Sequence, residues 1–452
     1  MPEKMTFEKM IANLYEEKKY ASIRDIFKTM NPTDIASIFQ GLEEEETKSA
    51  ALFRLLPKEL AAESFVEMSP ELQENLIIKL SDNELKQIVD ELYLDDAVDL
   101  VEEMPANVVK RILKQADPET RAMINEMLKY PEDSAGGIMT TEFVYFHPDF
   151  TVAEAIEKIR RTGVDSETIN ICYITDNIGK LAGTVSIRRL LLSDGNRKVG
   201  EVMDENVISV NTLEDKEKVA EVFRKYGFLA LPVVDGENRL VGIVTVDDAI
   251  DVISEEATED IEIMAAITPT HKPYLKTSVF SIWKSRIPWL LLLMVSATFT
   301  GMILTHFEDA LASQLVLVAY IPMLMDTGGN TGSQASTTVI RGLSLGEIEF
   351  KDILRVVWKE IRVAFFCGLT LAAANFLKLL VFDRLEITVA LVISITLVLT
   401  VLCAKTIGSV LPILSKKLGF DPAVMASPFI TTCVDAMSLM IYFRIASLLL
   451  HI

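Results

Sequence analysis

The sequence predicts a multidomain protein in which an α-helical superhelix and an α/β tandem repeat precede an all-α membrane domain with five transmembrane helices. The first observation is the uneven distribution of charge: the 452 residues carry a formal net charge of -21, yet the mean hydropathy is +0.29. Of 44 basic and 65 acidic side chains, residues 281–452 hold 13 and 11, which leaves 31 and 54 for residues 1–280. The second observation is an internal repeat with an offset of 59 residues. An acidic soluble part and an apolar membrane part are therefore separate, which excludes a single soluble globule.

Composition also limits the classes of function. An acidic soluble part repels phosphate backbones, and no basic stripe with interleaved aromatic residues is present, so we expect no nucleic-acid partner. The four cysteines lie far apart, which fits neither a zinc cluster nor a disulfide framework and indicates a reduced cytosolic setting. The sequence contains no P-loop, no HExxH motif and no Ser/His/Asp set, so we do not expect an enzyme.

Residues 1–130 form the first predicted domain. Between about residues 31 and 128 the chain reads as short amphipathic helices, and each interval between breaks is long enough for one helix and a turn. Stacked helices of this kind form an α-superhelix. The breaks fall at Pro57, Pro70, Asp82, Asp95, Pro105 and Pro118.

Residues 131–200 and 201–253 form two copies of the α/β repeat. Gly183 of the first copy aligns with Gly242 of the second, and Ser186 aligns with Thr245. Each copy contains a strand, a turn, a second strand with glycine and a helix, and an amphipathic helix lies upstream. This β-α-β-β-α layout resembles a tandem pair of CBS (cystathionine β-synthase) domains.

The CBS resemblance implies an adenine-nucleotide site in the second copy. There Thr245 is followed three positions later by Asp248, as in the family's pattern of a small hydroxyl residue and an aspartate at an adenosine site. In the first copy the aspartate position is Arg189, next to Arg188, which puts a symmetric pair of sites in doubt. An arginine there could instead meet a phosphate, so ATP or another adenine nucleotide is a candidate ligand.

Carboxylates crowd two regions of the soluble part. Asp95 and Asp99 share one helical face at i, i+4 spacing. Two carboxylates ~5 Å apart at an effective dielectric of ~20 repel by about 3 kcal/mol, which a bridging divalent cation would remove. We therefore predict metal binding, with a solvated acidic surface as the alternative for many single side chains. The second region contains Asp215, Glu217, Asp247, Asp248, Asp251, Glu255, Glu256, Glu259 and Asp260.

Residues 254–280 connect the repeat to the membrane part. Residues 254–267 are predicted to form one amphipathic helix, which is well placed to act as a lever or plug. A plain linker is the alternative.

Residues 281–452 are predicted to cross the bilayer five times, because about 20 apolar residues span ~30 Å of hydrocarbon. Lysine and arginine residues gather before the first span, between the second and third, and between the fourth and fifth. All three groups fall on one side, which places the N-terminal domains in the cytoplasm and the short C-terminus outside. The predicted spans are residues 287–307, 311–340, 363–382, 387–414 and 425–450.

The second span carries polar groups that a plain lipid-facing helix would not. Asp326 is followed by TGGNTGSQ (327–334), which includes Asn330 and Gln334. Its three glycines predict a helix-averse backbone, which a bilayer tolerates only where it is buried in protein or lines a wet cavity.

A second polar motif, residues 421–435, begins with Asp421 and ends with Asp435 about half-way through the fifth span. Ionisable residues at this depth are costly and usually functional. The alternative is a structural ion pair of Asp435 with Arg444 or Lys405.

A cation pore explains the types of residue in both motifs. Mg²⁺ is a hard cation that takes oxygen ligands and loses its waters reluctantly. Five helices make a thin wall, and a two-fold homodimer would bring two copies of Asp435 to one axis.

The chain as a whole resembles the MgtE family of Mg²⁺ channels, and the motifs that carry the resemblance are PEDSAGGIMT, the paired CBS domains, EEATEDI, TGGNTGSQ and DPAVMASPFITTCVD, in that order. The resemblance implies a homodimer with a pore on the two-fold axis, and a plug helix held closed when internal Mg²⁺ is high. It implies that Asp435 is the pore aspartate, with Asn330 and Thr431 nearby. Gly227 departs from the family, which can carry an acidic residue there. The implied regulatory ligands are Asp215, Glu217, Asp248, Asp251, Glu259 and Asp260, with Asp95 or Asp99.

The predicted function is therefore passive, gated Mg²⁺ uptake across the cell membrane. A negative-inside potential would drive a dication by about 4.6 kcal/mol per 100 mV, from roughly 2.3 per charge. A less selective transporter of Co²⁺, Mn²⁺ or Ca²⁺ and a CBS-regulated secondary transporter are the alternatives.

Overall fold

The structure, a computed structural model, describes residues 7–42, 46–270, 274–275, 277–307, 314–425 and 427–450. The chain divides into two compact units, Met1–Val252 and Ile253–Ile452, and each is described by itself.

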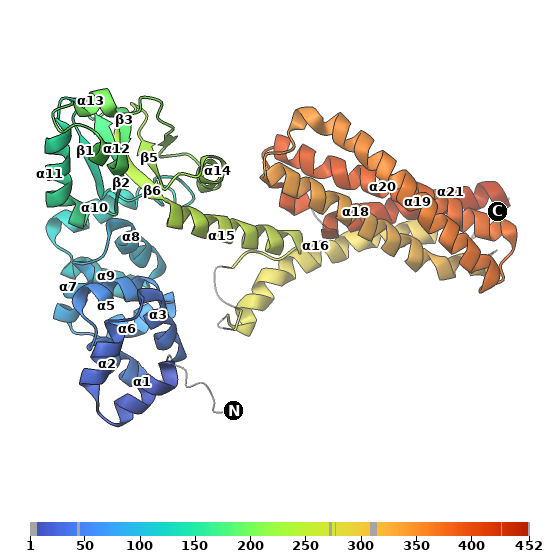
Figure 1. Ribbon diagram of the computed structural model, residues 1–452. Coiled ribbons are helices and arrows are strands. Elements are labelled where there is room, and N and C mark those ends of the chain that lie inside the picture. The colour runs from blue at the N-terminus through green and yellow to red at the C-terminus, as the bar shows by residue number, and fades with distance from the viewer. Residues whose placement is uncertain are drawn as a thin grey trace, which may run out of the picture. The chain divides into compact units, whose positions relative to one another are not determined.

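The first half of unit 1 is a stack of short helices, blue to cyan in Figure 1. Prolines at the first helical position start three of them, since proline's fixed φ suits that position and its missing N–H costs nothing there. Phe27, Phe39, Phe53 and Phe65 form a continuous row through the core, with successive ring centroids 5.9 to 6.2 Å apart. The predicted helical character of this part is confirmed. The helices are α1 (Phe7–Glu16), α2 (Tyr20–Phe27), α3 (Pro32–Gly41), α4 (Glu46–Phe53), α5 (Lys58–Val66), α6 (Pro70–Lys79), α7 (Asp82–Val89), α8 (Leu94–Glu103), α9 (Ala106–Gln115) and α10 (Pro118–Met127).

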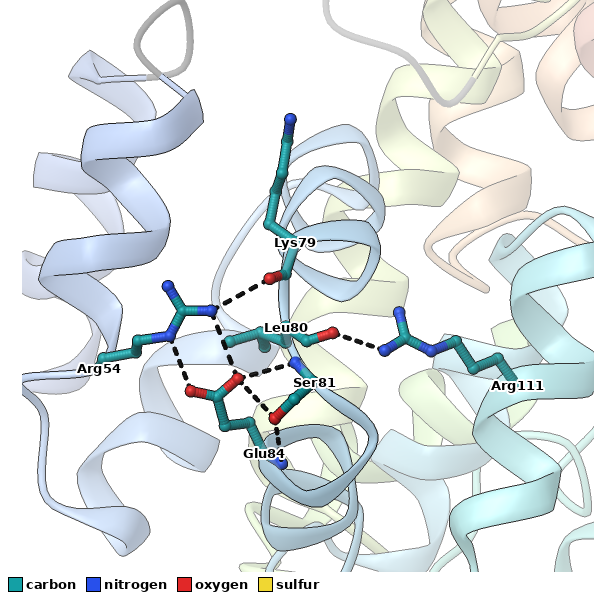
Figure 2. A network of polar contacts seen from close by, with 6 residues as sticks. All are labelled: Arg54, Lys79, Leu80, Ser81, Glu84 and Arg111. Carbon is teal, nitrogen blue, oxygen red and sulfur yellow. Dashed lines mark hydrogen bonds and ion pairs between the residues drawn. The ribbon is translucent and has the colours of Figure 1, made fainter.

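Polar contacts join four of these helices around the turn between α6 and α7 (Figure 2). Arg54, just after α4, donates to Glu84 of α7 at 2.7 Å and to the Lys79 carbonyl at 3.1 Å. Ser81 and Glu84 form a capping box at the start of α7. Arg111 of α9 donates to the Leu80 carbonyl. The hydrogen bond from Arg54 lowers the pKa of Glu84 to about 2.

The second half of unit 1 contains the predicted repeat as two three-stranded sheets of order β1-β2-β3 and β4-β5-β6. In each sheet the first two strands are parallel and the last two antiparallel. The first copy contains β1 (Phe143–Phe146), α11 (Val152–Thr162), η1 (Gly163–Asp165), β2 (Thr168–Thr175), β3 (Leu181–Ser186) and α12 (Ile187–Leu192). The second contains α13 (Val199–Val202), β4 (Val210–Asn211), α14 (Lys216–Tyr226), β5 (Ala230–Val234), β6 (Leu240–Thr245) and α15 (Val246–Met264).

The segment just before the first strand of each copy pairs with the other copy. Thr140 exchanges two backbone hydrogen bonds of 2.8 and 2.9 Å with Ile243 of β6, and Asp204 pairs with Thr184 of β3 in the same way. Gly242 permits this approach, because a Cβ there would lie 2.6 Å from the sulfur of Met139. The two copies are therefore interlocked.

Helix α15 is continuous through residue 253, where the sequence predicted the second copy to end. The predicted connecting helix is thus the second half of α15 rather than a separate element. Residues 267–270 follow without helix, and Thr268 donates to the Ser285 carbonyl at 3.0 Å.

Unit 2 is a helical bundle. In the part of the chain that the structure describes, four stretches are long and apolar enough to cross a membrane: Val279–His306, Phe350–Val381, Ile387–Lys417 and Pro422–Leu450. The second predicted span, residues 311–340, is not among these four. Its first three residues lie outside the described residues, and α18, which covers most of the remainder, is too polar to be counted as a span by composition. The count of five spans therefore stays a prediction. The elements are α16 (Val279–His306), η2 (Leu315–Tyr320), α18 (Ile321–Ser344), η3 (Phe350–Asp352), α19 (Ile353–Val381), α20 (Ile387–Lys417), η4 (Pro422–Met425) and α21 (Ser427–Leu450).

The expectation of helix-averse backbone at residues 327–334 is wrong, because α18 runs through them without a break. The glycines serve helix packing instead. A Cβ at Gly328 or Gly332 would meet side chains of α20 and α21 at 2.7 to 2.8 Å, and one at Gly408 of α20 would lie 2.3 Å from the Gly332 carbonyl. Small residues let membrane helices approach closely, and this packing outweighs the poor helix propensity of glycine.

Candidate functional site

Unit 1 gathers six carboxylates from two helices and two loops, which we call the acidic cluster: Asp95, Asp96, Asp99, Glu142, Glu167 and Asp248. Helix α8 begins at Leu94, whose N–H donates to Glu142 at 3.0 Å and so ties the helical domain to the repeat. Asp248 lies in the first turn of α15, where it accepts a 2.5 Å hydrogen bond from the Thr245 hydroxyl.

Burial and mutual repulsion destabilise the negatively charged forms of these carboxylates. Burial, followed by repulsion from Asp248, raises the pKa of Asp95 to about 7. Burial and the charge of Asp95 raise the pKa of Asp96 to about 8 and that of Asp99 to about 7. Burial and Asp95 likewise raise the pKa of Glu167 to about 7. At neutral pH, bound protons or bound cations therefore stabilise the cluster.

The cluster is an accumulation of charge rather than a formed coordination sphere. Within the described ranges, no three His, Cys, Asp or Glu side chains converge as ligands of one ion would. A cavity of about 230 Å³ beside α8 is lined by Asp96, Asp99 and Glu103 among other residues. Such a space suits a cation that keeps part of its water shell, as Mg²⁺ does.

Two members of the cluster, Glu142 and Glu167, were missed at the level of sequence. Each lies in a loop without helical periodicity, and only Asp165 is an acidic neighbour close in the chain, two residues before Glu167. Only the parallel pairing of β1 and β2, which starts with Phe143 opposite Thr168, brings the two loops to one edge.

The other predicted regulatory residues lie along α14 and α15. Asp215 caps α14 by accepting from the Glu217 N–H at 2.9 Å. Asp247 repels Asp248 and Glu167, so it lies at the border of the acidic cluster. Further along α15, Asp251 and Glu255 are exposed, and Glu256 and Glu259 are half-buried.

Asp260, in the last turns of α15, belongs to unit 2. It accepts a 3.5 Å hydrogen bond from Ser344 at the end of α18. Burial, followed by repulsion from Asp421, raises the pKa of Asp260. Asp421, predicted to belong to the pore, therefore lies within electrostatic range of the connecting part of α15, and its carboxylate also accepts from the Ala423 N–H at 2.7 Å.

The residues predicted for a nucleotide occupy equivalent places in the two copies. Thr245 and Asp248 form a hydroxyl-carboxylate pair at the start of α15. In the first copy the Ser186 hydroxyl accepts from the Arg189 N–H at 3.2 Å, and Arg188 and Arg189 are exposed.

In unit 2, one face of α18 is polar and exposed. Asp326, Asn330 and Gln334 follow each other at i, i+4 and i+8, so they lie on one side of the helix. Gly328 and Gly332 lie on the opposite, buried side. If α18 is the predicted second span, this charged and amide-bearing face needs water or another protein surface.

Asp435 of α21 lies beside this face. Asp326 is the charged group that interacts with it, and Thr431 packs against Gly329 one turn away from Asp435. Lys405 does not pair with Asp435 but is buried in an ion pair of 3.2 Å with Glu360 of α19, a residue that sequence reasoning missed.

These features define a polytopic membrane protein that carries an acidic part built from stacked helices and a CBS-type repeat. The family described as divalent cation transporter (MgtE) matches residues 321–445, the MgtE intracellular N domain matches residues 30–133, and the CBS domain matches residues 135–194 and 199–255. The chain belongs to the MgtE family, which is a family of transporters and not of enzymes.

Individual relatives support this membership over the full length. The magnesium transporter MgtE of Thermus thermophilus is 37% identical over 451 residues, which cover 98% of this chain and 99% of the relative. That of Bacillus subtilis is 33% identical over 458 residues and 100% of both chains. A crystal structure of the cytosolic domain of the Mg²⁺ channel MgtE in complex with ATP is 37% identical, with a TM-score of 0.51, and covers 54% of this chain and 98% of that chain.

Proposed function

We propose that this chain forms a pore for Mg²⁺ across the cell membrane, and that Mg²⁺ on the cytoplasmic side closes it. The observation that carries the proposal is the exposed row of Asp326, Asn330 and Gln334 on α18, with Asp435 next to it. These carboxylate and amide oxygens suit a hydrated hard cation. Relatives that are described as magnesium transporters agree with this choice of ion.

The polar face of α18 is exposed within a single copy, so it must be enclosed by something other than lipid. A second copy related by a two-fold axis would cover it and place two Asp435 carboxylates opposite each other. Helix α16, of which few residues are buried in one copy, adds apolar surface for lipid or for the partner. A homodimer is therefore part of the proposal, with the N-terminal domains in the cytoplasm and the C-terminus outside.

The acidic cluster is the proposed sensor. Without a cation, its mutual repulsion favours separation of α8 from the repeat, and bound Mg²⁺ would remove that repulsion. The pair of Asp260 and Asp421 would act in the same way between α15 and the pore helices. Mg²⁺ would then hold α15 as a plug. An adenine nucleotide beside Thr245 and Asp248 is a further proposal, supported by the ATP complex of a related structure.

The pore is tested by Asp435→Asn in the full chain reconstituted in liposomes, with a Mg²⁺-sensitive dye inside. We expect the loss of Mg²⁺ influx, because the substitution removes the carboxylate charge at nearly constant volume. Asp194→Asn, at an exposed turn in unit 1, is the control and should conduct normally. Unchanged influx through Asp435→Asn would refute the pore. Equal influx of Co²⁺, Mn²⁺ or Ca²⁺ through the unaltered chain would instead favour a general divalent-cation transporter.

A further inference from the structure

Three buried polar atoms without hydrogen-bond partners lie on the adjacent helices α20 and α21 of the membrane bundle. They are the hydroxyls of Thr400 on α20 and Ser438 on α21, and Oδ1 of Asp435. Thr400 and Ser438 are 0% and 1% exposed. A buried polar atom without a partner loses its bonds to water and gains nothing in return, so three such atoms on two packed helices indicate a shared use.

The close approach of three helices at Gly328 brings Thr400 and Ser438 together. A Cβ placed at Gly328 would lie 2.8 Å from Cγ2 of Thr400 and 3.1 Å from the hydroxyl oxygen of Ser438. Ser438 is also three residues after Asp435, so both side chains project from the same side of α21. Thr400 and Ser438 thus both lie at the buried side of α18, and Ser438 lies one turn from Asp435.

The hydroxyl of Thr400 differs in its bonding from those of other threonines in α20. Thr396 donates to the Val392 carbonyl at 2.7 Å, and Thr406 donates to the Leu402 carbonyl at 2.8 Å. This bond to the carbonyl four residues earlier is the usual way for a threonine to satisfy itself inside an apolar helix. Thr400 has no such bond in the described structure, which leaves its proton for another acceptor.

We infer that Thr400 and Ser438 are positioning residues for Asp435. Their hydroxyls donate to a bound water, which in turn donates to Oδ1, and so fix the plane of the carboxylate. The other oxygen, Oδ2, then faces the pore for the waters of the passing cation. A ligand that is held by an outer layer of hydrogen bonds binds its ion more tightly than one that rotates freely. The inference rests on the proposed function, since it assigns a role relative to the pore aspartate.

The experiment compares single variants of the full chain in liposomes by the initial rate of Mg²⁺ influx across a range of external Mg²⁺. Thr400→Val and Ser438→Ala remove the hydroxyls with little change in volume. Thr400→Ser keeps the hydroxyl. Thr396→Val is the matched control, because its equally buried hydroxyl is already bonded within its own helix.

We expect Thr400→Val and Ser438→Ala each to raise the Mg²⁺ concentration for half-maximal influx by about fivefold, the worth of one hydrogen bond, with the maximal rate changed by less than about twofold. Thr400→Ser and Thr396→Val should match the unaltered chain. A purely structural role would lower the amount of active protein, and hence the maximal rate, without moving half-saturation.

The inference would be overturned by normal half-saturation in both hydroxyl-deleted variants, or by equal effects of Thr400→Val and Thr400→Ser. If Asp435→Asn abolishes influx while those variants behave normally, only the positioning role fails. If Asp435→Asn conducts normally, the proposed pore fails and the inference fails with it.

Discussion

Replacing Asp95 by asparagine should make the closed arrangement of unit 1 less dependent on Mg²⁺. The substitution keeps the shape of the side chain and removes the charge that repels Asp248 across the boundary between α8 and the repeat. In Mg²⁺-free buffer the variant should therefore hold α8 against the repeat more firmly than the unaltered chain does.

The size of the effect follows from the pKa of Asp95, which is raised from 3.8 to about 7. A shift of about three units at 1.36 kcal/mol each corresponds to about 4 kcal/mol for charging this one carboxylate. Burial is the larger cause of this rise and repulsion the smaller, so we take half of this value for the repulsion that the substitution removes. The free energy of opening should thus rise by about 2 kcal/mol, which slows amide exchange in α8 on the order of 30-fold.

The assay is amide hydrogen exchange of the full chain in detergent at pH 8, with and without Mg²⁺, followed in peptides from α8. Glu205→Gln, which neutralises an exposed carboxylate of the same unit, is the control and should leave exchange unchanged. At saturating Mg²⁺ the advantage of Asp95→Asn should disappear, because the ion has already removed the repulsion. Equal exchange of the unaltered chain and the variant in Mg²⁺-free buffer would refute the reasoning.

The same cluster predicts the dependence on pH. A carboxyl whose pKa is raised on folding binds its proton more tightly in the closed arrangement, so the stability it contributes is greatest at low pH. That stability is lost as the pH rises through about 7. Lowering the pH from 8 to 6 without Mg²⁺ should consequently raise the protection factors of the α8 amides against hydrogen exchange in the unaltered chain. The rise should be smaller in Asp95→Asn.

Three further variants test the packing of each unit. Gly408→Ala would place a methyl group 2.3 Å from a backbone carbonyl of α18 and should lower the melting temperature in detergent by about 5 °C, whereas Gly301→Ala, with nothing within 4 Å, should leave it unchanged. Lys405→Met should destabilise unit 2 by about 3 kcal/mol, because it leaves Glu360 buried without its cation, and adding Glu360→Met should restore most of the loss in chemical denaturation. Glu84→Gln should cost unit 1 up to about 1 kcal/mol at pH 7, since the ion pair is partly exposed. That cost should fade in urea titrations as the pH falls from about 4.5 to about 2, because the unfolded chain takes up its proton first and the ion pair of the folded chain is lost only near the lowered pKa of Glu84.

The helices of unit 1 were predictable because their cause is local. Prolines such as Pro70 and Pro118 mark the first turns, and apolar residues recur with the period of a helix. The repeat was predictable for the same reason, since Gly183 and Gly242 occupy matching places on matching strands.

The errors came from interactions between distant parts of the chain. Residues 327–334 form a helix because α20 and α21 pack on their glycines, which local propensity cannot reveal. Asp95 and Asp99 were found by their helical spacing, whereas Glu142 and Glu167 join them only through the pairing of two strands. Lys405 was identified as an interruption of an apolar run, but its partner Glu360 lies 45 residues away on another helix.

The division of α18 into a polar face and a glycine face bears on how the protein is made. A helix with so many polar and small residues gains too little from lipid to enter the bilayer alone. Both helices that accept its glycine face, α20 and α21, follow it in the chain, so they are synthesised later. As the predicted second span, α18 should therefore insert stably only after the C-terminal helices are made, and a chain cut before α20 should be recognised as misassembled and degraded.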